Sequence, residues 1–374
     1  MPLGVRIIYF NLLSMHKPLK YINSEKSNFL TILKDRVDSY FKEKNISRHA
    51  NKWMIFKTVF FLSTGIVLYI CLLTGLFPVM LQLVAAILLG MTMAFIGFNV
   101  CHDALHMAYS SSKKVNNVLG FVFNVIGANT YMWNLTHNKV HHSYTNIVDH
   151  DEDIEIAPGL IRVNQADKAN KLHRYQHIYA FFLYSLTTLS WFFRKDYIKF
   201  FKKDIGDSHV NNHPRSEYYK LFFYKAIYYF LFIVLPLLVM NLTWWQFLIG
   251  FVAMNVAEGL VLGLVFQLAH VVEDTEIIHA ENNCIEDEWA VHQLKTTANF
   301  APTSRLANFL CGGLNLQVEH HLFPKICHVH YPKLSLIVRQ TAKEFNLPYH
   351  VNRSFFSALK SHYLFLKRLG RCTR

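Results

Sequence analysis

The sequence predicts an all-α integral membrane protein whose four transmembrane helices form two hairpins. Three observations support this fold class. Of the 374 residues, 52% are hydrophobic and only 17% are charged, whereas soluble domains have about 25% charged residues. Neither lysine nor arginine occurs at residues 58–112 or 226–294. Basic residues lie between and outside these stretches, as in the cytoplasmic loops of membrane proteins.

Each predicted span is an apolar stretch close to the roughly 20 residues that a helix needs to cross a bilayer. We expect spans at residues 55–75, 79–100, 221–240 and 244–268. The connections within each pair are very short and contain no basic residue, so each pair forms a hairpin. Lys225, near the start of the third span, is expected to extend its ammonium group to the interface.

The rest of the chain is arranged around these spans. Residues 118–133 and 178–193 are shorter apolar runs with polar interruptions, so they are expected to lie at the membrane surface. The predicted segments are a cytosolic N-terminal part (1–54), a membrane domain (55–348) and a basic C-terminal tail (349–374). Residues 1–21 have no small-residue cleavage site and are interpreted as an interfacial or disordered leader.

Charge and cysteine content exclude other classes of protein. Almost all the lysines and arginines that give the net charge of +13 lie in the loops and termini outside the spans. This distribution is typical of the cytoplasmic segments of a membrane protein, so we expect no nucleic-acid partner. The six cysteines have no CxxC spacing, which argues against a disulfide framework and a zinc ribbon.

Histidine is the most informative residue type, with 21 copies. Four segments, HDALH, HNKVHH, FQLAH and QVEHH, are all expected on one face of the membrane. Imidazoles four residues apart share one face of a helix, which suits a common metal ion. The candidate ligands are His102, His106, His137, His141, His142, His270, His320 and His321.

No single pair of these histidines is decisive. His173 and His177 have the same spacing and are interpreted as an ordinary helix face, and His150 and His292 as supporting residues. Eight imidazoles exceed the needs of one metal and predict two. Imidazole suits Fe, Zn, Cu and Ni. Iron is favoured, because a substrate within lipid is mostly unactivated CH₂ and its oxidation requires an oxidant made from O₂.

The segments HDALH, HNKVHH and QVEHH resemble the three histidine boxes of the membrane fatty acid desaturases. The flanks WNLTHNKVHHSYTN and GGLNLQVEHHLFP are also similar, and the resemblance extends over about residues 53–348. It implies a cytosolic helical cap that holds a di-iron centre, two Fe²⁺ ions with the eight histidines as ligands, and O₂ as co-substrate.

Gln317 stands where many family members have the first histidine of the third box. This replacement resembles the front-end subgroup, which inserts a cis double bond between an existing one and the carboxyl end. Gln317 could bind the metal, hydrogen-bond a metal-bound water, or only pack. The implied substrate is an acyl chain on CoA or on a lipid.

The sequence has no HPGG haem motif, so we expect a separate electron donor, a ferredoxin or a cytochrome b5, and a bacterial inner membrane as the location. One basic cluster could dock this donor, hold lipid or CoA phosphates, or reflect only the charge of a cytoplasmic loop. The cluster consists of Arg194, Lys195, Lys199, Lys202 and Lys203.

Other polar and aromatic residues are weaker candidates. Asp103 and Glu319, beside box histidines, could orient imidazoles or be solvated, and the same applies to Glu273 and Asp274. Five aromatic residues are candidates for the wall of an acyl tunnel, although simple helix packing is the more common role for each: Phe95, Phe98, Trp133, Phe251 and Phe266.

Three alternative functions are left open. Hydroxylation or formation of an acetylenic bond could occur at the same site, and no motif separates them from desaturation. A metal transporter or sensor would require polar residues along the spans, which contain almost none besides Glu258. A membrane scaffold without catalysis would have no need for eight converging imidazoles.

Overall fold

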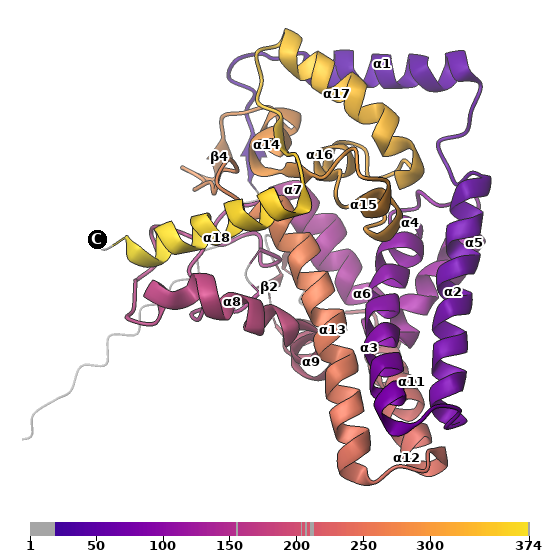
Figure 1. Cartoon of the computed structure of the whole chain (residues 1–374). Coiled ribbons are helices and arrows are strands. Elements are labelled where there is room, and N and C mark those ends of the chain that lie inside the picture. Colours follow the sequence, from indigo (N-terminus) through magenta and orange to yellow (C-terminus); the bar gives the residue numbers. More distant parts are fainter. Residues whose placement is uncertain (1–18, 155, 203, 206–207, 210–212, 373–374) are drawn as a thin grey trace, which may run out of the picture.

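The computed structural model describes residues 19–154, 156–202, 204–205, 208–209 and 213–372. The predicted leader therefore lies almost wholly outside the described residues, as does Lys203 of the basic cluster. Figure 1 shows long helices in the lower half of the molecule and shorter helices gathered above them. We call this upper part the cap.

Within the described part of the chain, four helices are long and apolar enough to cross a membrane, which confirms the predicted number of spans. Two of them are continuous runs of several helical elements. The spans are α2 (Lys52–Leu73); α3 (Val79–Ile96) with η1 (Gly97–Cys101) and α4 (His102–Leu105); α11 (Arg215–Tyr229) with η5 (Phe230–Val234) and α12 (Leu235–Val239); and α13 (Trp244–His270).

The helices extend a few residues beyond the predicted spans. α2 begins at Lys52 because the side chain of Asn51 caps it, accepting a hydrogen bond from the backbone N–H of Met54 at 3.0 Å. α11 begins directly after Pro214, and its first turns are polar, so hydropathy located the start of this span too late. α13 ends at His270 and therefore carries this candidate ligand on its last turn.

The two hairpins pack through α3 and α13, which lie side by side in Figure 1. The contact is close at Gly90, where a Cβ atom would lie 2.0 Å from the carbonyl oxygen of Met254. On the outer surface of α2, large apolar side chains such as Ile66 (59% exposed) and Val67 (56%) are more than half exposed. Such exposure suits contact with lipid.

The two shorter apolar runs do not form spans. Residues 118–133 belong to α5 (Lys113–Val125) and α6 (Thr130–Trp133), and residues 178–193 to α8 (Gln176–Ser185), α9 (Thr187–Ser190) and η4 (Trp191–Lys195). Each helix is too short to cross a bilayer. Their position at the membrane surface remains a prediction.

Lys225 does not extend to the interface, so this prediction was wrong. The side chain is 2% exposed, and its ammonium group donates hydrogen bonds of 2.7 Å to the carboxylate of Asp196 and to the carbonyl of Gly127. Asp196 begins α10 (Asp196–Phe200), far from Lys225 in sequence. A buried cation is tolerated when such a partner is present, and the partner is visible only in the folded chain.

The cap consists of further short helices and of two-stranded sheets. Its remaining helices are α1 (Phe29–Lys44), η2 (Asn134–His141), α7 (His142–Tyr144), η3 (His173–Tyr175), α14 (Trp289–Thr296), α15 (Arg305–Leu310), α16 (Gln317–Leu322), η6 (His328–His330), α17 (Tyr331–Glu344) and α18 (Phe355–Arg371). The paired strands are β1 (Lys20–Tyr21) with β4 (Cys284–Ile285), parallel; β2 (Asp204–Ile205) with β3 (Ser208–His209), antiparallel; and β5 (Ala298–Phe300) with β6 (His350–Asn352), parallel.

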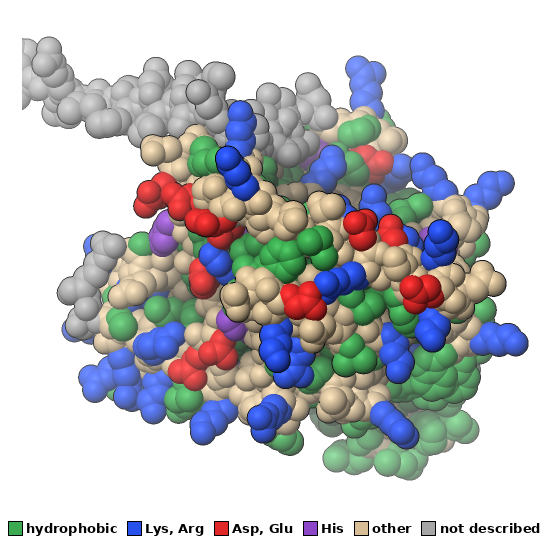
Figure 2. All heavy atoms as spheres, turned by 90° about the horizontal axis from the view of Figure 1, so that it is seen from above, with side chains coloured by type: hydrophobic (Ala, Val, Ile, Leu, Met, Phe, Trp, Pro, Cys, Tyr) green, Lys and Arg blue, Asp and Glu red, His purple; other side chains and the backbone are tan. Residues whose placement is uncertain are grey.

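Apolar packing joins α1 and α18, the first and last of the described helices, to the rest of the cap. α1 lies against α17 over a core that includes the fully buried Phe29, Leu33 and Val338. Beyond the predicted boundary at residue 348, β6 pairs with β5, and α18 buries Phe365 and Leu366 near α8. Figure 2, a view onto the cap, shows many exposed lysine and arginine side chains with fewer acidic ones among them. The predicted basic character of these segments is thus visible on this surface.

Candidate metal centre

The candidate ligands lie where the spans meet the cap. His102 and His106 follow η1, a π-helical turn that interrupts the second span. His137 and His141 belong to a second π-helix, η2, with their rings stacked at a centroid distance of 5.0 Å. π-Helical turns are rare and occur frequently at functional sites. His142 follows on α7.

The remaining candidates come from the second half of the chain. His270 is the last residue of α13. His320 and His321 lie on the six-residue helix α16. All eight candidate side chains are buried, with no more than 7% of any of them exposed.

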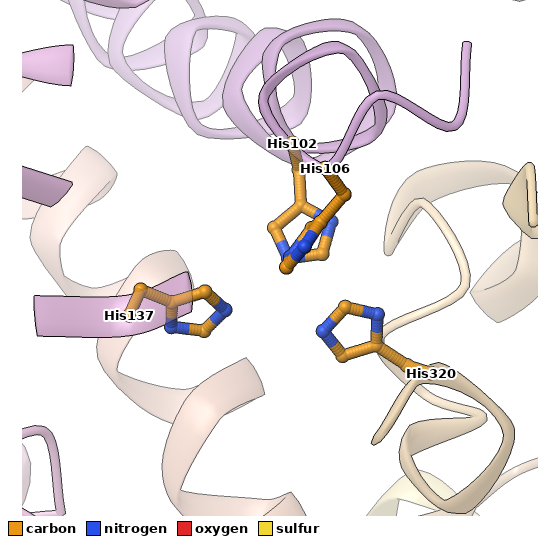
Figure 3. Close-up of side chains that lie close together, drawn as sticks. All are labelled: His102, His106, His137 and His320. Atoms are coloured by element: carbon orange, nitrogen blue, oxygen red, sulfur yellow. The ribbon is translucent and has the colours of Figure 1, made fainter. Parts of the chain in front are cut away.

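The structure brings all eight imidazoles together in three overlapping groups. In each group the possible ligand atoms lie within 4.8 Å of one another. The first group, shown in Figure 3, is His102, His106, His137 and His320. The second group is His141, His270 and His321. His142 forms a third group with His320 and His321, and it therefore lies between the first two.

Hydrogen bonds at Nδ1 hold five of these rings in place. In the first group, Nδ1 of His137 lies 3.4 Å from Asp153, and Nδ1 of His320 lies 3.4 Å from the hydroxyl of Tyr331. The second group has corresponding contacts to the Asp151 carboxylate from His141 (2.9 Å), to the Gln293 side-chain oxygen from His321 (2.8 Å) and to the Thr296 carbonyl from His270 (3.4 Å). Metal-binding histidines are typically held at their second nitrogen in this way.

The opposite nitrogens have no such partners. Five Nε2 atoms are buried without a hydrogen-bond partner among the described residues. In His142, both ring nitrogens are buried and lack such a partner. A buried, unsatisfied nitrogen costs about 1–3 kcal/mol, so six such rings facing one another indicate missing ligands. A cation bound in each of the two main groups would satisfy them. The five are His102, His106, His137, His141 and His320.

Burial keeps most of these rings in the neutral form that binds metals. It lowers the pKa of His137, although Asp153 acts in the opposite direction. Burial and the neighbouring imidazoles lower the pKa well below its usual value in four rings, His106, His142, His320 and His321. In His141, burial also lowers the pKa, but the carboxylate of Asp151 outweighs it and the net shift is upward.

Gln317 lies at the second group. Its amide nitrogen is 2.9 Å from Nε2 of His270 and 3.3 Å from Nε2 of His321, while its amide oxygen has no partner among the described residues. A half-turn of the amide exchanges its nitrogen and oxygen without a change of shape. The oxygen would then point at the space between the two imidazoles. Gln317 is therefore positioned to supply a fourth donor atom to the second group.

Two predicted orienting residues have other roles. Asp103 accepts hydrogen bonds from His328, at its backbone N–H (3.1 Å) and at Nδ1 (3.0 Å). Glu319 accepts hydrogen bonds from Asn299 and Tyr349, both at 2.8 Å. Both carboxylates are buried, so neither is solvated, and the hydrogen bonds they accept come from residues other than the candidate ligands. The prediction placed them correctly beside the histidines but could not show their side-chain partners.

The sequence analysis missed the residues that hold the rings. Asp151 and Asp153 belong to the acidic run DHDED, which follows HNKVHH closely enough to fold back on it. This acidic run could have indicated the carboxylates that hold the imidazoles. Nothing in the sequence indicates Gln293, because it is a single polar residue on a helix. His150 bonds to a backbone carbonyl, and His292 supports the Thr145 carbonyl beside the second group.

Two adjoining cavities lie beside the first group. The one nearer to it has a volume of about 110 Å³ and the other about 630 Å³. Trp133 and Phe266 line the nearer cavity and separate it from His137, with ring centroids 4.4 and 5.7 Å from that imidazole. The two cavities adjoin along the shared lining residues Glu152, Ile156, Thr187, Lys195 and Lys199, and we refer to the pair as the passage.

The predicted basic cluster lies at the outer end of this passage, where Arg194 and Lys202 complete the lining. Its lysines are partly occupied: Lys199 forms an ion pair with Asp153 at 3.4 Å, and Lys195 donates to the carbonyl of Ile156 at 2.7 Å. Lys202 pairs with Glu152.

The other candidate wall residues lie elsewhere. Phe251 lines a separate apolar pocket between the spans, and Phe95 and Phe98 pack in the protein core.

Comparison with known proteins agrees with this geometry. The fatty acid desaturase family model matches residues 77–353. This chain belongs to the fatty acid desaturase family. It is 35% identical to the sn-1 linoleoyl-lipid 6-desaturase of Arthrospira platensis, over 90% of this chain and 91% of the relative. The corresponding enzyme of Synechocystis sp. is also 35% identical, over 94% and 98%.

A third relative, the acyl-lipid (8-3)-desaturase of Physcomitrium patens, is 35% identical over 94% of this chain and 74% of its own length. These relatives confirm the predictions of a membrane fatty acid desaturase and of an oxidoreductase, and they support the front-end type that Gln317 suggested. The desaturase is a multi-pass membrane protein.

Proposed function

We propose that this desaturase acts on acyl chains of membrane lipids, inserts a cis double bond on the carboxyl side of an existing one, and uses two iron ions and O₂. The observation that carries the proposal is the passage with a basic mouth that reaches Trp133 and Phe266, the ring neighbours of His137, beside eight converging imidazoles. The relatives named for acyl-lipid and linoleoyl-lipid substrates support the same substrate class.

The passage fits a molecule with an anionic head and a long apolar tail. Arg194, Lys195 and Lys202 supply positive charge at the mouth. Deeper in, Trp133, Leu262 and Phe266 provide an apolar floor. A lipid phosphate held at the mouth would leave its acyl chain to extend toward the first group. The distance from mouth to metal would then select a position counted from the carboxyl end.

The ligand set fits two metal ions. The first group would hold one with four imidazoles, and the second group would hold the other with three imidazoles and the amide oxygen of Gln317. His142 lies within reach of both groups. All donors are nitrogen or a single amide oxygen, a set that iron accepts. Bound iron would supply the oxidising power, drawn from O₂, that breaking unactivated C–H bonds requires.

The chain's own residues would prepare the site for this chemistry. Trp133 and Phe266 would hold methylene groups beside His137 and exclude water. The carboxylates of Asp151 and Asp153 would keep the Nε2 atoms of His141 and His137 directed at the metals. The balanced reaction would convert –CH₂–CH₂– to –CH=CH–, with O₂, two electrons and two protons consumed and two water molecules formed.

The electrons would come from a separate ferredoxin or cytochrome b5. The charge of the cap supports a cytoplasmic active site, and the bacterial inner membrane remains our prediction for the location.

The test is fatty acid profiling of a host that lacks polyunsaturated lipids and is fed defined fatty acids. We expect a new double bond on the carboxyl side of an existing one in cells with the wild type. Its first appearance in phospholipids, before the acyl-CoA pool, would support the lipid-linked substrate, and the reverse order would contradict it.

Other products would change the assignment. A new bond in saturated chains would contradict the front-end type, and a hydroxylated product would indicate the sister reaction. Iron analysis of the purified protein tests the cofactor separately, with about two ions per chain as the expected result.

A further inference from the structure

A buried chain of three polar side chains lies beside the first group and has no role in the function proposed above. The ammonium group of Lys57 lies 2.8 Å from Nε2 of His328. Nδ1 of His328 lies 3.0 Å from the carboxylate of Asp103. The three residues are 1%, 3% and 2% exposed. They belong to the first span, to η6 of the cap and to the end of the second span.

The charges of these three side chains explain why a lysine is buried here. A buried ammonium group is unfavourable unless it is paired. Lys57 also donates to the carbonyl of Asn308 at 3.2 Å, but that oxygen carries no formal charge. The negative partner is Asp103, reached through the imidazole of His328, which accepts from Lys57 and donates to the carboxylate. With a hydrogen on Nδ1 of His328 and none on Nε2, the hydrogen bonds of all three side chains form together.

Asp103 connects this chain to the first group. It lies between His102 and His106 in the last turn of the second span, directly after the π-helical turn η1, and the helix ends at His106. Its carboxylate is held twice by His328, at the backbone N–H (3.1 Å) and at Nδ1 (3.0 Å). The last turn of a helix lacks partners for its final carbonyl groups and is prone to fray. These contacts therefore fix the end of the span against the cap, and with it the direction of the two imidazoles.

The same part of the cap also supports His320. Tyr331 follows η6 directly, and its hydroxyl lies 3.4 Å from Nδ1 of His320. Three of the four imidazoles of the first group thus depend on the segment around His328. The second group depends on other residues, namely Asp151, Gln293 and Thr296.

We propose that Lys57, His328 and Asp103 are positioning residues for the first metal site. They hold His102 and His106 in the orientation that binds metal, while the second site is independent of them. The inference rests on the two metal sites of the proposed function.

A third metal site is the competing explanation, because Asp103, Cys327 and His328 lie close enough together to form one. The contact from Lys57 argues against it: Nε2 of His328 already accepts a hydrogen bond, and the ammonium group would lie beside the ion.

The test compares metal binding by four purified full-length variants: Lys57→Met, His328→Leu, His328→Asn and Lys225→Met. Asparagine keeps a donor where Nδ1 of His328 lies, so His328→Asn retains the bond to Asp103. Lys225→Met is the matched control, because Lys225 is also buried with one carboxylate partner but touches none of the candidate ligands. The readouts are iron per chain, a Co²⁺ titration followed by its visible spectrum, and the Tm of the metal-free protein.

We expect the wild type to bind two metal ions. His328→Leu and Lys57→Met should bind the first about 10- to 100-fold more weakly, the range seen when support of metal ligands is lost, and retain the second. His328→Asn should bind the first ion more tightly than His328→Leu does. Lys225→Met should lower the Tm but leave both affinities unchanged.

Other outcomes decide between the two proposals. Two ions bound with wild-type affinity by every variant would overturn this inference alone, and so would an equal loss at both sites. A third ion in the wild type, lost in His328→Leu, would overturn it in favour of a metal site at Cys327. A wild type without metal would overturn the proposed metal centre together with the inference.

Discussion

The two main histidine groups meet the same requirement in different ways. The first group has four imidazoles, and its Nδ1 contacts are long, 3.4 Å to Asp153 and 3.4 Å to Tyr331. The second group has three imidazoles, and all three have Nδ1 contacts, of 2.9 Å to Asp151, 2.8 Å to Gln293 and 3.4 Å to Thr296. The group with fewer donors is thus held more tightly from behind. This difference suggests that a weaker ligand set is tolerable when its geometry is well supported.

The largest effect is expected from a residue of the first group that also contacts His142, the imidazole between the two main groups. His320 belongs to the first group and also to the group around His142. His320→Ala should reduce desaturation on the order of 10³-fold or more, because it removes part of the catalytic unit. His150→Ala is the control, since His150 is buried nearby and bonds a backbone carbonyl. Product formation in cells measures both, and substantial activity in His320→Ala would show that His320 is no ligand.

The support of the two groups can be compared directly with Asp151→Asn and Asp153→Asn. Asp151 also accepts the backbone N–H of Asn146 at 2.9 Å, whereas Asp153 shares its charge with Lys199. We expect Asp151→Asn to weaken metal binding about 10- to 100-fold, and Asp153→Asn to have the smaller effect. Co²⁺ titration of both variants measures this. A larger loss in Asp153→Asn would reverse the comparison between the groups.

Acid should destabilise the metal-free protein through its buried neutral histidines. Burial lowers the pKa of His292, behind the second group, and of His362 on α18 to about 4, from about 6.5 in the unfolded chain. Their contribution is fully present above pH 6.5 and is lost as the pH falls toward 4, because the unfolded state then binds more protons. The loss is about 1.4 kcal/mol per pH unit for each group.

The Tm of the metal-free protein, measured between pH 7 and pH 5, should therefore decrease. His141 has the opposite sign, because its pKa is raised, and it opposes this trend. His362→Asn should flatten the dependence. A Tm that stayed constant over this range would show that these imidazoles are not buried in the neutral form.

The smallest effect is expected at Gln317. Gln317→Ala removes the amide oxygen that we place as the fourth donor of the second group and should weaken metal binding there on the order of tenfold. The first site should be unaffected. Gln317→Glu is the informative companion, because it keeps an oxygen at the same position. If both variants bound metal like the wild type, Gln317 would be a packing residue.

The elements of the fold that follow from local composition could be predicted. Apolar length identified the four spans, and charge identified which segments join the cap. Their ends were less certain, because the cap at Asn51 and the polar start of α11 depend on local hydrogen bonds and not on hydropathy. Lys225 was mistaken for an interfacial residue because its partner, Asp196, lies in a separate helix.

The same distinction, between local features and contacts made only in the fold, applies to the candidate site. The eight histidines were recognisable because their motifs, taken together, have no simple structural explanation, and the structure brings them all together. The acceptors behind them were not recognised. Asp151 and Gln293 resemble any polar residue until the fold places them against an imidazole, and Asp103 pairs with His328, more than 200 residues further along the chain.

The sequence by itself determined the membrane class, the four spans, the eight candidate histidines and, with Gln317, the front-end resemblance. These properties depend on residue type and spacing along one helix or segment, which the chain carries in any conformation. Only the tertiary structure decided how the imidazoles divide into two groups, which residues hold each ring, and where the passage lies beside them. These depend on contacts between distant segments, because hydrogen bonds and ion pairs form only when folding brings both partners within about 3 Å.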